Sequence, residues 1–182
     1  MKKQKFTFID LFAGIGGFHQ AMHKLGGECR GFSEIDPYCI ETYKQNFTST
    51  KFLGDINNID AEKLPDFDVV CGGFPCQPFS KAGKRLGFED EDRGQLFYRI
   101  TDILKKKPTV KFIILENVRN LADHSENWNT ITKELKELGF IITQNPIILS
   151  PSDFGIPQNR ERVYILGIKK EHANAKISKR DS

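Results

Sequence analysis

The stretch Asp10–Gly17, with the sequence DLFAGIGG, joins an apolar run at Phe6–Phe12 to a segment with helical spacing at Phe18–Leu25. The apolar run predicts a buried strand, and the spacing after it predicts a helix. Glycines between a strand and a helix let the backbone approach a ligand closely, which indicates a cofactor turn. Many α/β proteins have such turns without a ligand, so both readings stay open for this segment alone. The glycine spacing departs from the G-x-G-x-x-G pattern, which disfavours an NAD-dependent oxidoreductase.

The alternation of strand and helix patterns continues along the whole chain. Further strands are expected at Cys29–Phe32, Asp68–Cys71, Val110–Leu115 and Val163–Ile168, with a short one at Lys51–Leu53. Further helices are expected at Pro37–Asn46, Leu96–Lys106 and Trp128–Leu138, the last of which stops at Gly139. This order predicts an α/β fold with a doubly wound, Rossmann-like and mostly parallel sheet. Ile141–Leu149 and Val163–Ile168 are expected to form an antiparallel hairpin at one edge.

Length and composition fit one domain with a real core. The 182 residues are 38% hydrophobic and 28% charged, and no apolar run approaches the roughly 20 residues that a membrane helix needs. We expect a cytoplasmic protein with a domain at residues 1–168 and a polar, flexible tail at 169–182. The net charge of +3 is compatible with nucleic acid but does not demand it.

The four cysteines show neither a CxxC pair nor histidines at zinc spacing, so no metal site and no disulfide framework is indicated. We expect Cys29, Cys39 and Cys71 to be buried as small hydrophobic residues. Cys76 differs, because it follows the strand Asp68–Cys71 between two prolines, at the edge where open α/β sheets bind ligands. A presented thiol at that edge is a candidate nucleophile.

Acidic residues follow two of the strands next to the glycine turn. Glu34 follows the second strand, where an acid in these folds accepts hydrogen bonds from ribose hydroxyls, and Asp55 is placed to receive an adenine amino group. Each acid alone is more often a loop carboxylate or a helix cap, as we expect for Asp36 before Pro37. Together with the glycine turn they indicate a nucleoside pocket, which a nucleoside cofactor such as S-adenosylmethionine (AdoMet) fits best.

Two further polar segments lie at strand ends. Glu116 emerges from the apolar strand Val110–Leu115, and dehydration there should raise its pKa. Arg160 and Arg162 precede the last strand and offer guanidinium groups for a phosphate or a carbonyl oxygen, although a surface ion pair is the ordinary alternative. The segment Gln77–Gln95 has no sustained apolar period and is expected to be a long loop that closes over substrate.

These segments together resemble the DNA (cytosine-5) methyltransferases. DLFAGIGGF, Pro75-Cys76-Gln77, Glu116-Asn117-Val118 and Gln158-Asn159-Arg160-Glu161-Arg162 stand in the order that this family uses. The resemblance covers the chain from Phe6 to about Gly167 and is what implies AdoMet, cytosine and double-stranded DNA. It implies an AdoMet pocket lined by Phe12, Gly14, Gly16, Glu34, Ile35, Asp55, Ile56, Pro75 and Leu96.

The resemblance also implies a mechanism. The Cys76 thiolate would add to C6 of cytosine, which activates C5 toward the methyl sulfonium of AdoMet. Glu116 would hydrogen-bond N3 and the exocyclic amine, Arg162 would bind O2, and Arg160 would support the cysteine or a backbone phosphate. The target base must be flipped out of the duplex for this chemistry.

In the family, the chain continues into a target-recognition region and a terminal segment that returns to the AdoMet pocket, whereas this sequence stops at Ser182. We therefore expect a split or truncated enzyme of a restriction-modification type system, whose second polypeptide supplies the rest, or an inactive AdoMet- and DNA-binding remnant. A cytosine-5 tRNA methyltransferase is a further alternative, because a related branch of the family modifies tRNA.

Overall fold

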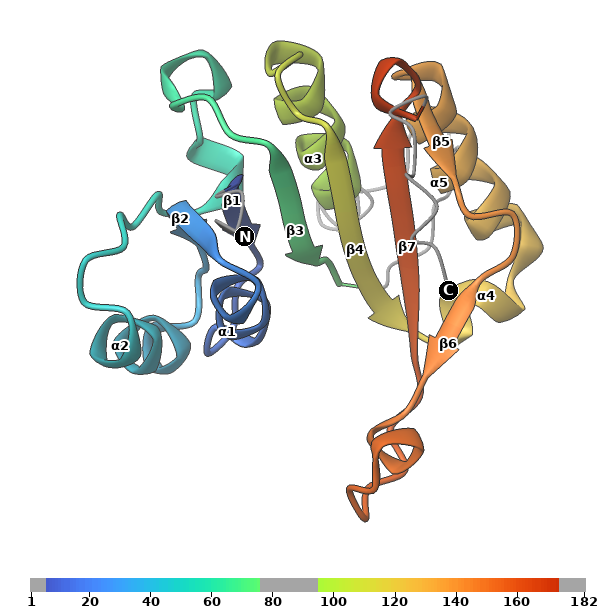
Figure 1. Ribbon diagram of the computed structural model, residues 1–182, viewed down its shortest axis with the longest axis horizontal. Helices are drawn as coiled ribbons and strands as arrows, with labels where there is room; N and C mark the ends of the chain where they lie inside the picture. The colour runs from blue at the N-terminus through green and yellow to red at the C-terminus, as the bar shows by residue number, and fades with distance from the viewer. Residues whose placement is uncertain (1–5, 76–94, 174–182) are drawn as a thin grey trace, which may run out of the picture.

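A computed structural model describes residues 6–75 and 95–173, and within them one mixed β-sheet forms the centre of the molecule (Figure 1). The strand order is β2-β1-β3-β4-β7-β5, with β6 also paired to β7. The strands are β1 (Phe6–Leu11), β2 (Gly27–Ser33), β3 (Val69–Gly73), β4 (Phe112–Val118), β5 (Phe140–Ile142), β6 (Ile147–Leu149) and β7 (Arg162–Lys169).

The sheet is parallel in its first part and antiparallel at β7. β2, β1, β3 and β4 pair in parallel, whereas β4, β5 and β6 all pair antiparallel with β7. This confirms the predicted mostly parallel sheet with an antiparallel edge. The expected strand Ile141–Leu149 is interrupted between β5 and β6, where Pro146 lacks the N–H that a continuous strand needs. The expected strand Lys51–Leu53 is reduced to a single bridge between Phe32 and Phe52.

The helices confirm the predicted alternation. They are α1 (Gly17–Lys24), α2 (Pro37–Asn46), α3 (Gln95–Lys106), α4 (Asn120–Asp123) and α5 (Ser125–Glu137), with 3₁₀ turns η1 (Ile56–Asn58), η2 (Ala61–Lys63), η3 (Pro151–Phe154) and η4 (Lys170–His172). Asp36 caps α2 as expected, because its side chain accepts hydrogen bonds from the backbone of Tyr38 and Cys39. Gly139 follows α5 with a φ of 84°, the left-handed conformation typical of a helix stop.

The two faces of the sheet are covered by different helices, which makes the fold doubly wound. Ile9, Leu11 and Val70 lie in the largest core cluster with side chains of α3, α4 and α5. Phe8 and Cys71 point to the opposite face and pack with Met22 of α1. Alternate residues of each strand therefore serve opposite layers, as the strand period requires.

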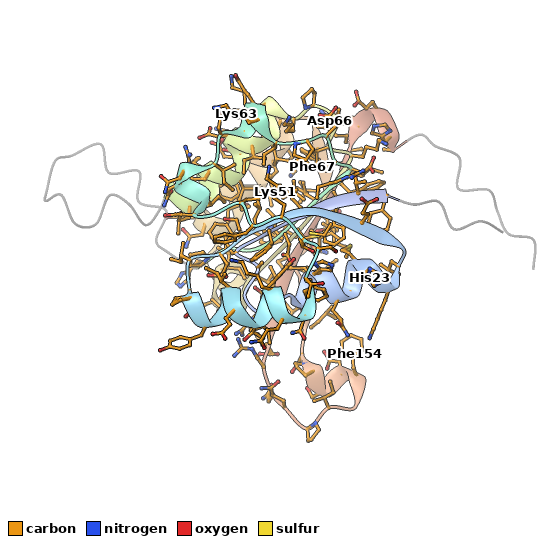
Figure 2. All side chains as sticks on the ribbon, turned by 90° about the vertical axis from the view of Figure 1, so that its left-hand side faces the viewer. His23, Lys51, Lys63, Asp66, Phe67 and Phe154 are labelled. Atoms are coloured by element: carbon orange, nitrogen blue, oxygen red, sulfur yellow. The ribbon has the colours of Figure 1, made fainter. Side chains whose placement is uncertain are left out.

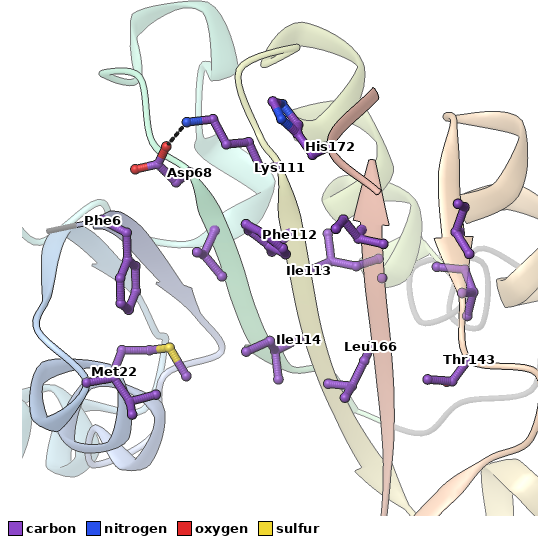
Figure 3. Close-up of a pocket in the computed structure, with 16 residues that line it drawn as sticks. Phe6, Met22, Asp68, Lys111, Phe112, Ile113, Ile114, Thr143, Leu166 and His172 are labelled. Carbon is purple, nitrogen blue, oxygen red and sulfur yellow. Dashed lines mark hydrogen bonds and ion pairs between the residues drawn. The ribbon is translucent and has the colours of Figure 1, made fainter. Parts of the chain in front are cut away.

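One part of the α1 face stays open over β3, β4, β7 and β5. Among the described residues no helix covers this part, and the strands line a groove of about 950 Å³. Phe112, Ile114 and Leu166 lie side by side along this groove, with Met22 at one side of it (Figure 3). Phe112 and Leu166 are 41% and 37% exposed, although strand residues of a sheet with parallel β3 and β4 are normally covered on both faces.

A narrow arm between β6 and β7 extends away from the body of the molecule (Figures 1 and 2). It contains η3, which is closed by a capping box between Ser150 and Asp153 and by Gly155 in the left-handed conformation. Phe154 is 67% exposed on this arm. The arm brings the chain back to Arg160 and Arg162 at the start of β7.

Two expectations of burial were wrong. Cys71 is fully buried as predicted, but Cys29 and Cys39 are only partly buried, because they lie on the flank formed by β2 and α2. At the end of the described part of the chain, Lys169 is the last residue of β7, and η4 follows it. The Lys169 ammonium lies 4.7 Å from the centre of the Phe140 ring, which holds this end on the sheet. The remainder of the expected tail, 174–182, lies outside the described residues.

No helix of residues 6–75 and 95–173 is long and apolar enough to cross a membrane. The same described residues contain no cluster of His, Cys, Asp and Glu that could hold a metal ion.

Candidate active site

The carboxyl ends of β1, β2, β3 and β4 meet at one edge of the sheet, which is the edge where open α/β sheets bind ligands. The turn after β1, Glu34 after β2, Pro75 after β3 and Glu116 in β4 all lie at this edge. The sequence predicted this convergence, because the carboxyl ends of parallel strands share one side of a sheet. Cys76 and the expected loop Gln77–Gln95 lie outside the described residues, except that Gln95 begins α3.

The glycine turn after β1 is tightly bent. Phe12 has a φ of 54°, which is uncommon for a residue with a side chain and is typical of functional turns. Gly14 and Gly16 have φ values of 54° and 95°. A Cβ on Gly16 would collide with the Phe47 ring, whereas a Cβ on Gly14 would meet nothing within 4 Å. Gly16 is therefore needed for packing, while the space beside Gly14 is open for a ligand.

Glu34 holds the turn in place. One carboxylate oxygen, Oε2, accepts a hydrogen bond from the Gly14 backbone N–H at 2.7 Å. The other, Oε1, accepts from the backbone N–H groups of Ile35 and Asp36 at 2.8 and 3.0 Å. Ile35 beside it is 72% exposed. Glu34 and the glycine turn thus form one hydrogen-bonded unit with an exposed apolar neighbour.

A second connection links this unit to Asp55, and the sequence did not reveal it. The Ala13 backbone N–H donates to the Ser33 carbonyl at 3.0 Å, and the Ser33 hydroxyl donates to the Gly54 carbonyl at 2.7 Å. Asp55 caps η1 by accepting from the Asn57 backbone N–H at 2.9 Å. Ser33 therefore fixes the place of Asp55 relative to the turn.

The other residues expected at the cofactor site differ in exposure. Ile56 is 3% exposed and belongs to the core cluster on the α3 face. Leu96 is partly buried against the same cluster, and Pro75 is exposed at the end of the segment that follows β3. The structure thus brings Phe12, Gly14 and Glu34 together directly, whereas Ile56 packs mainly into the core.

Glu116 and Arg162 form an ion pair at the ends of β4 and β7. Arg162 Nε lies 2.9 Å from Glu116 Oε1, and both side chains are about four-fifths buried. Burial raises the pKa of Glu116, while the charges of Arg162 and Arg160 oppose this rise without cancelling it. The predicted upward direction is confirmed, and the carboxyl group is easier to protonate than an ordinary glutamate.

Gly73 of β3 faces this carboxyl group. Gly73 pairs with Glu116 across the parallel strands, and a Cβ on Gly73 would lie 3.1 Å from Glu116 Oε2. The Gly72-Gly73 doublet before Pro75 is a sequence signal for the close approach of another group to this backbone. The sequence does not show that this group is the Glu116 carboxylate.

Arg160 and Glu161 immediately precede Arg162 and are more exposed than the Glu116–Arg162 ion pair. Glu161 accepts a hydrogen bond from Arg119 at 2.7 Å in an exposed ion pair, and the Arg160 backbone N–H donates to the Ser150 hydroxyl at 3.1 Å. The two arginines therefore have different surroundings: Arg162 is paired with the buried carboxyl group, while the Arg160 side chain is exposed.

The model of the C-5 cytosine-specific DNA methylase family matches residues 6–182. The chain belongs to this family. It is 47% identical to the Type II methyltransferase M.HpaII of Haemophilus parainfluenzae over 173 residues, which are 92% of this chain and 47% of that protein. It is also 47% identical to the Type II methyltransferase M.NgoBI of Neisseria gonorrhoeae, over 89% of this chain and 50% of that protein. The chain thus spans about half the length of the curated relatives that it matches.

Solved structures give the same result for the fold. A putative DNA modification methyltransferase encoded within an Escherichia coli prophage superposes with a TM-score of 0.75 at 27% identity, covering 91% of this chain and 47% of that one. A DNMT2 mutant of Spodoptera frugiperda superposes with a TM-score of 0.73 at 28% identity, covering 97% and 54%. The cytosine methylase family and its fold are therefore established for this chain.

Asn117 lies beside the candidate site residues, and the sequence assigned no role to it. It is 1% exposed, and its side-chain amide donates to the Phe74 carbonyl at 2.8 Å, while its amide oxygen accepts from the Val118 backbone N–H. Because Phe74 immediately precedes Pro75 and Cys76, Asn117 fixes the backbone that leads to the candidate nucleophile.

We expect Asn117→Leu to destabilise the fold by about 1 to 3 kcal/mol, because it leaves the buried Phe74 carbonyl without a donor. Urea unfolding of the full chain measures this. Asn129→Leu, an exposed position on α5, is the matched control and should change stability by less than about 0.5 kcal/mol. Equal stability of Asn117→Leu and the control would show that this hydrogen bond does not hold the segment.

Proposed function

We propose that this chain is the AdoMet-binding and catalytic part of a DNA (cytosine-5) methyltransferase of a restriction-modification type system. The observation that carries the proposal is the largely buried Glu116–Arg162 ion pair, which lies at the same sheet edge as the glycine turn and the segment that leads to Cys76. Membership of the cytosine methylase family supports the substrate base. The relatives' designation as Type II methyltransferases supports the type of system.

The residues of the turn fit AdoMet. The Glu34 carboxylate accepts three backbone hydrogen bonds, two at Oε1 and one at Oε2, so one lone pair of Oε2 stays available for a ribose hydroxyl. The open space beside Gly14 lets a ligand lie against the backbone, and exposed Ile35 offers an apolar surface for adenine. When bound, AdoMet supplies the electrophilic methyl group. Asp55, Ile56, Pro75, Leu96, Phe12 and Gly16 complete the proposed pocket.

The proposed reaction uses the protein residues as follows. Cys76 adds as thiolate to C6 of a flipped-out cytosine, and the ring becomes an enamine that is nucleophilic at C5. Glu116 donates a hydrogen bond to N3 and accepts one from the exocyclic amine, so that negative charge on the ring is neutralised as the Cys76–C6 bond forms. After C5 has gained the methyl group, a water molecule removes the C5 proton, the C5–C6 double bond reforms, and the thiolate leaves.

The Glu116–Arg162 pair suits this task. The raised pKa of Glu116 makes a proton available for N3, and the guanidinium that holds the carboxyl group also offers N–H donors for the O2 carbonyl. We propose that Arg160, whose side chain is exposed, supports Cys76 or binds a DNA phosphate.

The open groove over β3, β4, β7 and β5 supports a partner for this chain. The relatives are about twice as long, and we propose that a polypeptide equivalent to their remaining half, on the same chain or on a second one, packs on this groove and supplies target recognition. Packing would bury Phe112, Ile114 and Leu166, which lie on the face of β4 and β7 that also carries Glu116 and Arg162.

We expect Leu166→Asp to weaken association with this second half by at least about tenfold, because a charge would be buried in the groove. The remaining half of the Haemophilus parainfluenzae relative, co-expressed as a separate polypeptide, is the probe, and co-purification is the readout. Tyr38→Asp, at an 80% exposed position outside the groove, should co-purify like the wild type. Equal recovery of the Leu166→Asp variant would place the contact elsewhere.

Transfer of tritiated methyl groups from AdoMet to mixed-sequence DNA tests the proposed function. The full chain is assayed together with the same second half, and transfer RNA is offered in a parallel reaction. Label in DNA at C5 of cytosine supports the proposal. Label in tRNA alone would favour the RNA alternative, and label in neither from a pair that binds AdoMet and DNA would favour an inactive remnant.

A further inference from the structure

A buried polar cluster lies beneath the glycine turn, and the proposed mechanism does not use it. Asp10 is 0% exposed at the end of β1. The Tyr43 hydroxyl of α2 donates to Asp10 Oδ2 at 3.4 Å and lies 2.8 Å from His19 Nδ1 of α1. The Cys29 thiol of β2 lies 3.8 Å from the same hydroxyl. Four elements thus contribute one polar side chain each to this cluster.

The Asp10 carboxyl group lacks the hydrogen bonds that would stabilise a negative charge. Its Oδ1 atom is buried without a hydrogen-bond partner among the described residues, and its one side-chain hydrogen bond is long. Burial raises the pKa of Asp10 to about 8; the His19 backbone N–H and the Tyr43 hydroxyl act to lower it, and the charge of Glu34 adds to the rise. A buried charge without a partner is costly, so the carboxyl group is neutral in the folded protein near pH 7.

Within residues 6–75 and 95–173, the neighbours of Asp10 supply no positive charge to pair with it. Burial, together with the charge of His23, lowers the pKa of His19 to about 4, and the His19 ring stacks on Phe47 at 3.7 Å between ring centres. His19 is therefore a neutral imidazole at pH 7. The thiols of Cys29 and Cys71, which also face Asp10, have pKa values raised by burial and stay protonated.

The cluster supports both ends of the glycine turn. Asp10 stands before the turn, and the His19 backbone N–H, which interacts with its carboxyl group, belongs to the helix after it. On the other side, Gly16 packs so closely that a Cβ there would lie 3.2 Å from the Tyr43 ring. A new charge on Asp10 would therefore act directly beneath the backbone that Glu34 and the cofactor contact.

We propose that Asp10 is a positioning residue, held as a neutral carboxylic acid, which keeps the glycine turn in its binding conformation, and that its ionisation at alkaline pH weakens AdoMet binding. The second half of this proposal rests on the proposed function, whereas the first half does not. The groups that face Asp10 from the surrounding elements are Tyr43, His19, Cys29, Cys71 and Glu34.

The neutral state can be tested without any cofactor. Since the pKa of Asp10 is higher in the folded chain than in the unfolded one, its contribution to stability is full below about pH 4 and is lost as the pH rises to about 8. The unfolding constant of the wild type, relative to that of Asp10→Asn, should therefore rise by about tenfold per pH unit between pH 5 and pH 7 and level off above pH 8. A ratio that is constant above pH 5 would overturn the proposal.

A direct titration of Asp10 in the wild type tests the neutral state even if Asp10→Asn fails to fold. The carboxyl carbon of Asp10, followed by NMR of ¹³C-labelled wild-type chain, should titrate with a pKa of about 8, well above the ordinary aspartate value. Tyr43→Phe keeps the ring that stacks on Phe32 and removes a hydroxyl that lowers the pKa, so the midpoint should move upward. An Asp10 signal that titrates near pH 4 in the wild type would contradict the neutral state.

The pH profile of AdoMet affinity tests the positioning role. We expect the dissociation constant of the wild type to rise at least tenfold between pH 7 and pH 9.5, and that of Asp10→Asn to stay within about threefold. Asp66→Asn, at an exposed position, should follow the wild type. Parallel profiles for the wild type and Asp10→Asn would remove the positioning role, whereas absence of AdoMet binding in all variants at every pH would refute the proposed cofactor and leave the titration result standing.

Discussion

Replacement of Cys76 by alanine is expected to reduce methyl transfer to DNA by about 10⁴-fold or more, while the dissociation constant for AdoMet changes by less than about threefold. Cytosine C5 is a weak nucleophile until a thiolate has added to C6, and loss of a covalent nucleophile removes that activation entirely. The measurement is single-turnover transfer of a tritiated methyl group by the chain together with its second half.

The matched control for Cys76→Ala is Cys39→Ala. Cys39 is a partly buried thiol on α2 that takes no part in the proposed chemistry, so its loss should leave transfer within about twofold. Transfer by Cys76→Ala within tenfold of the wild type would exclude the covalent mechanism, whatever the behaviour of the control.

Replacement of Glu116 by glutamine is expected to reduce methyl transfer by about 10² to 10³-fold. Glutamine keeps the shape of the side chain but has no carboxyl proton to give N3, and it offers the Arg162 guanidinium a neutral amide oxygen in place of a carboxylate. The loss should appear mainly in the rate of the chemical step, measured with saturating DNA and AdoMet, because the pair contacts the ring as its charge changes.

Glu161→Gln provides the control for this position. Glu161 also pairs with an arginine at short distance, but that ion pair with Arg119 is exposed, and such pairs contribute little to stability. We expect transfer within about threefold of the wild type. If Glu161→Gln and Glu116→Gln lost activity equally, the effect would reflect the general charge of this edge and not a proton at N3.

The sequence predicted which of the candidate residues lie together at the carboxyl ends of the strands. Asp10–Gly17, Glu34 and Glu116 each follow or end an apolar strand, and the parallel pairing that brings strand ends together is a property of the fold class. The upward direction of the Glu116 pKa followed from the same position, since an acid that ends a buried strand loses water.

What the sequence could not give are contacts between residues far apart in the chain. The bond from Asn117 to Phe74 spans 43 positions, and the approach of Tyr43 to Asp10 spans 33. Neither leaves a periodic signal, because each depends on how two elements pack. The reduction of Lys51–Leu53 to one bridge likewise depends on which strand lies alongside, whereas Pro146 already marks the interruption of Ile141–Leu149 in the sequence.

The most direct test of the catalytic assignment is trapping of the covalent intermediate. The chain, joined to the remaining half of the Haemophilus parainfluenzae relative and checked for AdoMet and DNA binding, is incubated with AdoMet and mixed-sequence DNA that contains 5-fluorocytosine. Fluorine at C5 cannot leave as a proton does, so the Cys76–C6 bond should persist, and we expect a protein–DNA adduct that survives denaturation and is absent with Cys76→Ala. A preparation that binds both AdoMet and DNA but forms no adduct, or forms it equally with Cys76→Ala, would contradict the assignment.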